Sequence, residues 1–169
     1  MKPISGIFVC CGLHLFSATL VHAQTTSGII QSDESWSDTI RVTGDIQIPT
    51  AVTLTVEPGT VILVAAHEDD QRTGHGGGPI DPITWQHEPV DDRSHISIGV
   101  DGTLDAIGTP DQPIWFTSTA TIGDIQEPTK HDWDSISISG TANLEHCIIE
   151  YVGGMNIPSS SVNISNCVL

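Results

Sequence analysis

The chain has 169 residues, of which 38% are hydrophobic, so it is long and apolar enough for one domain with a buried core. It carries 21 acidic side chains against 5 basic ones, for a formal net charge of −16. Because phosphate contacts depend on Lys and Arg, this balance argues against nucleic acid and anionic lipid surfaces as partners. It is compatible with an exported protein, and with cation binding where carboxylates converge.

Residues 1–23 have the pattern of a secretory signal peptide. A positive start precedes an apolar stretch from Ile4 to Leu20, and the residues Val21-His22-Ala23 fit cleavage before Gln24. The stretch is shorter than the ~20 residues of a membrane-spanning helix and contains His14, so no membrane span is expected. We therefore expect a secreted, extracellular or cell-surface protein, with the periplasm as an alternative.

The segment 24–37 is interpreted as an N-terminal linker or cap, and regular structure is expected over 38–169. There, short runs of β-branched residues alternate with Gly, Pro, Asp and Asn, while helical periodicity is absent. Strands of three to five residues are weak alone and need neighbours above and below. The pattern predicts an all-β solenoid of stacked parallel strands. Its expected core includes Leu54, Val56, Leu104, Ile114 and Phe116.

An internal repeat near the end of the chain gives the length of one winding. Residues 143–149 align with residues 163–169, which places Cys147 and Cys167 at equivalent positions 20 residues apart. In stacked windings the two thiols would be neighbours on adjacent rungs, about 4.8 Å apart. Regular stacking fits disulfide geometry poorly, so two buried free thiols are favoured over a disulfide.

Two segments interrupt the series of short strands and are predicted to be loop insertions. The first, 67–94, is rich in Gly, Pro and acidic residues, and the second is 119–131. Ile114 and Cys147 are 33 residues apart, and removing the 13 residues of the second loop leaves the 20-residue spacing of the repeat. The agreement supports one winding plus an insertion.

Three stretches resemble a known group of proteins. TLTVEPGTVI (53–62), HISIGVDGTLDAIGTPDQPIWFTS (95–118) and LEHCIIEY (144–151) are similar to successive coils of bacterial secreted right-handed parallel β-helix repeat proteins, the pectate-lyase-like superfold. The resemblance implies a right-handed parallel β-helix. It does not imply one task, because this superfold includes lyases, hydrolases, adhesins and passive stalks.

The repeat pattern continues up to Leu169. An open end of a solenoid exposes strand edges and apolar core. We therefore expect an uncapped C-terminal end in a fragment of a longer protein, covered by further chain or by a capping partner.

The acidic loop contains the candidate metal ligands. Paired carboxylates on a Gly-rich loop suit Ca²⁺, although no D-x-D-x-D-G motif is present. The histidines in and next to this loop, His67, His75, His87 and His95, would suit a transition metal, but the H-x-x-x-H spacing is absent. The alternative is a solvated acidic loop, and no cofactor is required. The candidate calcium ligands are Asp69, Asp70, Asp91 and Asp92.

No residue is assigned a catalytic role. Asp132 and Asp134 are interpreted as turn residues leading into a strand, with a convergent acid pair as the alternative. Trp115 alternates with apolar neighbours and is predicted to point outward, where it could contact sugar or be covered by the loop 119–131. The other candidates for sugar stacking are Trp36, Trp85 and Trp133.

Three functions are compatible with these features. The favoured one is a secreted or surface-exposed, non-catalytic β-helix scaffold or adhesin-like segment that contacts a polysaccharide or another cell-surface component. The alternatives are the N-terminal part of a carbohydrate-active lyase or hydrolase, and a calcium-stabilised binding module. Converging carboxylates in a groove would favour a hydrolase. A flat sheet face with Ser and Thr would favour the scaffold, and calcium-dependent melting would favour the third.

Overall fold

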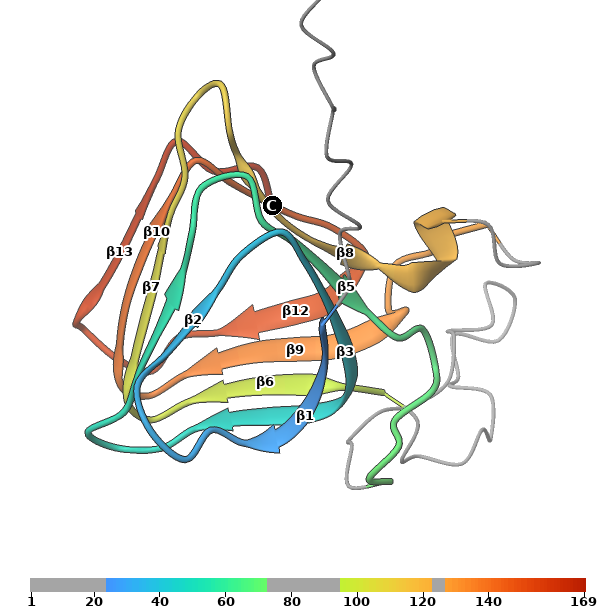
Figure 1. Cartoon of the computed structure of the whole chain (residues 1–169), viewed down its shortest axis with the longest axis horizontal. Helices are drawn as coiled ribbons and strands as arrows, with labels where there is room; N and C mark the ends of the chain where they lie inside the picture. The colour runs from blue at the N-terminus through green and yellow to red at the C-terminus, as the bar shows by residue number, and fades with distance from the viewer. Residues whose placement is uncertain (1–23, 73–94, 123–126) are drawn as a thin grey trace, which may run out of the picture.

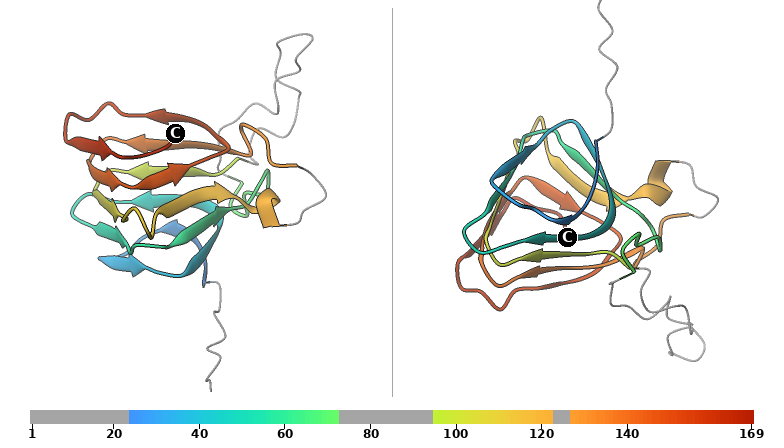
Figure 2. Two further views of the ribbon diagram at one scale, coloured as in Figure 1. Left: turned by 90° about the horizontal axis from the view of Figure 1, so that it is seen from above. Right: turned by 60° about the horizontal axis from the view of Figure 1, so that its bottom comes forward.

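A computed structural model describes residues 24–72, 95–122 and 127–169. These residues form thirteen β-strands and one short 3₁₀ helix, η1 (Thr119–Ile122), and every pairing between strands is parallel. The predicted all-β class is confirmed at this level. Figure 1 shows a three-sided outline, with the strands arranged around a central core, and Figure 2 shows the strands stacked in layers.

The strands fall into two sheets, and the larger one bends to form two of the three sides. The first side comprises β5 (Val61–Val64), β8 (Ile114–Ser118) and β11 (Cys147–Ile149). The second comprises β6 (Ser97–Val100), β9 (Trp133–Ile138) and β12 (Val152–Asn156). The strand β3 (Thr39–Ile48) continues through both sides, and β1 (Gln24–Ile29) lies beside it.

The third side is the smaller sheet. It consists of β2 (Glu34–Trp36), β4 (Thr53–Val56), β7 (Thr103–Ile107), β10 (Thr141–Glu145) and β13 (Val162–Ser165). The segment 24–37, interpreted from the sequence as a linker or cap, thus contributes two strands to the first layer.

The register confirms the predicted repeat. Ala142 pairs with Val162, so equivalent residues of the last two layers are 20 residues apart. Ile114 pairs with Cys147, as expected if the 33-residue separation is one layer plus an insertion. The segment 127–131 and η1 lie in the predicted second loop. Residues 67–72 carry no strand, and 73–94 lie outside the described residues.

Alternation along each strand sends one set of side chains into the core. In β3, buried and partly exposed residues alternate over all ten positions. All five residues predicted from the sequence to face the core are buried, and each contributes about 1.5–3 kcal/mol through removal from water. Trp115 is only partly buried between two buried neighbours and faces outward as predicted.

Two of the predicted sugar-stacking tryptophans are core residues instead. Trp36 and Trp133 are 1% and 0% exposed. The indole nitrogen of Trp133 donates a hydrogen bond to the backbone oxygen of Glu150 at 3.0 Å, so its polar atom is satisfied inside the protein. Neither ring can stack on a ligand. Trp85 lies outside the described residues.

The corners between sides use glycine for two different reasons. Gly59 has a φ of 81° in the turn after Pro58, a conformation that glycine adopts without steric cost. Gly102 and Gly140 are required by space instead. A Cβ on Gly102 would lie 2.2 Å from the backbone oxygen of Pro49, and a Cβ on Gly140 would lie 2.2 Å from the backbone oxygen of Gly102. The two glycines form one close-packed corner in successive layers.

Cys147 and Cys167 are adjacent, as the repeat predicts, and both are free thiols. The backbone nitrogen of Cys147 lies 3.4 Å from the sulfur of Cys167. Cys147 is fully buried, while Cys167 is partly exposed. Burial, and next the neighbouring thiol of Cys167, raise the pKa of Cys147 to about 12 from its ordinary value of 9.0.

This raised pKa predicts a loss of stability in alkali. The unfolded chain releases the Cys147 proton near pH 9.0, whereas the folded chain keeps it until about pH 12. Stability is therefore lost progressively as the pH rises through this window. The free energy of unfolding, measured in urea from pH 8 to pH 11, should fall more steeply for the wild type than for Cys147→Ala. Parallel curves for the two proteins would contradict the assignment.

Candidate functional site

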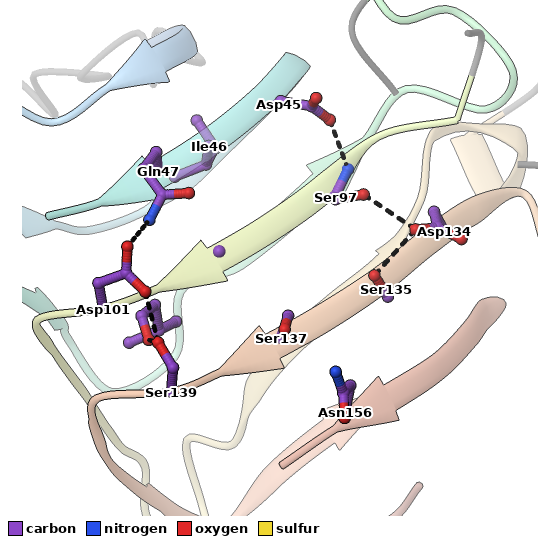
Figure 3. A pocket seen from close by; sticks show the side chains of 12 residues that line it. Asp45, Ile46, Gln47, Ser97, Asp101, Asp134, Ser135, Ser137, Ser139 and Asn156 are labelled. Carbon is purple, nitrogen blue, oxygen red and sulfur yellow. Dashed lines mark hydrogen bonds between the residues drawn. The ribbon is translucent and has the colours of Figure 1, made fainter. Parts of the chain in front are cut away.

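A polar groove of about 490 Å³ runs across the outer surface of the second side. It is formed where outward-facing positions of β3, β6, β9 and β12 lie side by side (Figure 3). Because the alternate residues of these strands fill the core, the groove receives mainly their polar side chains. Its lining side chains include Asp45, Gln47, Ser97, Asp101, Asp134, Ser135, Ser137, Ser139 and Asn156.

One end of the groove is organised around Ser97. Its backbone N–H donates to Asp45 at 2.7 Å, and its hydroxyl donates to Asp134 at 3.0 Å. Asp134 also accepts the hydroxyl of Ser135 at 2.9 Å. The two carboxylates therefore bracket one serine and are held by neighbours in adjacent strands, as Figure 3 shows.

The opposite end is organised around Asp101. Its carboxylate accepts hydrogen bonds from the amide of Gln47, at 2.9 Å, and from the hydroxyl of Ser139. The Gln47 side chain lies directly over Gly99, where a Cβ would come within 2.3 Å of its Oε1. Because Gly99 has no side chain, it leaves room for the Gln47 amide on the sheet surface. Ser137 and Asn156 lie between the two ends and across the groove (Figure 3).

The groove presents hydroxyls, amides and carboxylates on a sheet surface. Such a set can exchange several hydrogen bonds with a hydroxyl-rich molecule, because both donors and acceptors are available. The three carboxylates already accept hydrogen bonds from serines, glutamine or backbone. The groove therefore combines hydroxyls on a sheet face with two carboxylates that converge on one serine.

Of the four predicted calcium ligands, two lie in described residues. Asp69 is buried and accepts the backbone N–H of Gln71, and Asp70 accepts the hydroxyl of Thr43 at 2.6 Å. Both carboxylates lie over Gly44, where a Cβ would be 2.2 Å from an oxygen of Asp70 and 3.1 Å from one of Asp69. The other two ligands, Asp91 and Asp92, lie outside the described residues.

A histidine pair lies beside the groove, close to Asp134. Nδ1 of His67 and Nε2 of His95 are 2.9 Å apart, and their rings meet edge to face at 89°. Nε2 of His67 lies 3.7 Å from Oδ1 of Asp132. Burial, and next the charge of His67, lower the pKa of His95, against an opposing effect of Asp134. Within residues 24–72, 95–122 and 127–169, no three His, Cys, Asp or Glu side chains are arranged around one metal position.

Sequence reasoning grouped His67 and His95 in an acidic loop and interpreted Asp132 and Asp134 as turn residues. Asp132 lies in the turn that leads into β9, as predicted, and is buried, whereas Asp134 is the second residue of β9 itself. Asp45, Asp101 and the serines of the groove were not singled out. The alternation Ser135-Ile136-Ser137-Ile138-Ser139 was the available signal, because it places three hydroxyls on one outer face.

The chain was compared with family models, curated proteins and solved structures, and none of them matches it. Among the residues that the structure describes, no helix has the length and apolar character needed to cross a bilayer. The features of this chain that bear on function are therefore the groove and the histidine pair.

Proposed function

We propose that this chain is a right-handed parallel β-helix that is exported and acts as a rigid, non-catalytic binding scaffold at the cell surface. Its ligand on this proposal is a glycan, held along the groove of the second side. The observation that carries the proposal is the row of hydroxyl, amide and carboxylate groups on adjacent parallel strands. The repeated register and the three-sided outline support the helical fold, and the pattern of residues 1–23 supports export.

The charge of the groove favours a neutral glycan over a polyuronate. Asp45, Asp101 and Asp134 line the groove, and in the described part of the chain no Lys or Arg is among its lining residues. A carboxylated polymer would meet repulsion from these groups and from a net charge of −16. A neutral sugar can instead donate hydroxyl hydrogens to the carboxylates and accept from Gln47 and Asn156.

The test is binding of soluble neutral polysaccharides and of a polyuronate, measured by affinity electrophoresis and calorimetry. Wild-type protein should bind at least one neutral polymer and not the polyuronate. Ser137→Leu places an apolar side chain in the middle of the groove and should weaken binding about tenfold or more, equivalent to at least ~1.4 kcal/mol. The matched control is Thr55→Leu, an outward-facing position of β4 on the third side.

The control variant should bind like the wild type, because its side chain lies outside the groove. Equal loss of binding in both variants, or binding of the polyuronate alone, would contradict a neutral-glycan groove. Release of reducing sugar or unsaturated product from any of the polymers would favour the enzymatic alternative instead.

A further inference from the structure

The histidine pair is built by three chain segments that the fold holds in fixed positions. His67 follows β5, His95 precedes β6 by two residues, and Asp132 directly precedes β9. The backbone N–H of His67 donates to the backbone oxygen of Asp132 at 3.1 Å, and the N–H of Asp134 donates to the oxygen of Ile96 at 2.9 Å. These two bonds fix the three segments relative to one another, which is how a preorganised site is supported.

Asp132 has a buried oxygen atom that the fold leaves unsatisfied. Its side chain is 3% exposed. Oδ1 accepts hydrogen bonds from the N–H and the hydroxyl of Thr129, at 3.1 and 2.8 Å, whereas Oδ2 is buried without a hydrogen-bond partner among the described residues. A buried carboxylate oxygen in this state is costly unless positive charge lies close by. The ring of His67 faces the other oxygen of this carboxylate, with its Nε2 3.7 Å from Oδ1.

The orientation of His67 matches that of a metal-binding histidine. Ligating histidines commonly direct one ring nitrogen to a carboxylate, which leaves the lone pair of the other nitrogen for the metal. Here Nε2 of His67 faces Asp132, and Nδ1 faces Nε2 of His95. Two imidazole nitrogens on a tetrahedral zinc ion are about 3.3 Å apart, so the 2.9 Å pair needs only a small ring rotation.

We propose that His67 and His95 bind one transition-metal ion of the zinc type through Nδ1 and Nε2, respectively, with Asp132 as the carboxylate that orients His67. Imidazole ligands favour such borderline ions over Ca²⁺. His95 is deeply buried, whereas the side chain of His67 is 28% exposed, so the ion enters from the side of His67 and water completes its coordination. When the ion takes the place of the proton between the two nitrogens, that proton moves to the outer nitrogen of its own ring, so both imidazoles bind as neutral ligands.

Titration of the untagged chain with Zn²⁺ by calorimetry, and with Co²⁺ by visible absorption, tests this site. One ion per chain is expected. His67→Asn is the informative variant, because His67 has a φ of 53° and Asn is among the residues that tolerate this left-handed conformation. It should abolish the Co²⁺ spectrum, while Asp132→Asn should weaken Zn²⁺ binding by roughly 10–100-fold.

Two controls separate this site from other histidines. His146→Asn, on a corner beside Glu145 where φ is 49°, and the double variant His75→Gln/His87→Gln should bind Zn²⁺ and Co²⁺ like the wild type. Circular dichroism establishes that each variant is folded before titration. Absence of binding to the folded wild type at 100 µM Zn²⁺, unchanged binding by His67→Asn, or loss of binding in the double variant would overturn the proposal.

Discussion

Replacing Gly140 by alanine should severely destabilise the protein. The added Cβ would lie 2.2 Å from the backbone oxygen of Gly102 and 2.5 Å from that of Asp101. These are backbone atoms of the layer beneath, and Gly102 in turn packs against the backbone of Pro49, so the clash cannot be relieved by one side-chain rotation. We expect a loss of about 3 kcal/mol or more in the free energy of unfolding, measured by urea denaturation.

The chain supplies a matched control at Gly154. A Cβ at this position in β12 would meet no atom within 4 Å. Gly154→Ala should change the free energy of unfolding by no more than about 0.5 kcal/mol, or should stabilise the protein slightly through the unfolded chain. Equal effects of the two substitutions would show that the layers are not in close backbone contact at the Gly140 corner.

Replacing Trp133 by alanine should cause a loss of about 3–5 kcal/mol in the free energy of unfolding. The indole is fully buried at the start of β9, and removing it opens a cavity and leaves the backbone oxygen of Glu150 without its donor. Trp133→Phe keeps most of the ring volume and loses only the hydrogen bond, so a smaller loss of about 1–3 kcal/mol is expected. Thermal and urea unfolding followed by circular dichroism measure both.

Trp115 provides the comparison for this prediction, because it has the same chemistry but points outward from β8. Trp115→Ala should destabilise the protein clearly less than Trp133→Ala. The reverse order would mean that the assignment of inward and outward faces is wrong.

The sequence predicted the repeat and the core because both depend on local periodicity. Alternation of apolar residues places Leu54, Leu104 and Ile114 inside, and the 20-residue offset of the cysteines sets the length of a layer. Prediction of the tryptophans was less successful. Burial of Trp36 and Trp133 depends on strands that are distant in the sequence, so isolated aromatic residues gave no sign of it.

The candidate sites were less predictable, for a related reason. The groove assembles Asp45, Ser97 and Asp134 from three strands, and no short motif connects residues so far apart in the chain. His67 and His95 were noticed in one acidic loop, but Asp132 became their neighbour only through the parallel pairing of β6 with β9. Spacing along the chain therefore pointed to these residue types, but it did not show which of them lie together in the fold.

Successive layers stack in parallel register, and backbone nuclear Overhauser effects test this arrangement without any substitution. Thr55, Asp105, Asn143 and Asn163 occupy one ladder across the third side. Close interstrand proton contacts should join Thr55 to Asp105, Asp105 to Asn143, and Asn143 to Asn163, each about 4.8 Å apart between strands. Contacts that instead follow antiparallel pairing between strands consecutive in the sequence would contradict the stacked fold and the groove and metal site that depend on it.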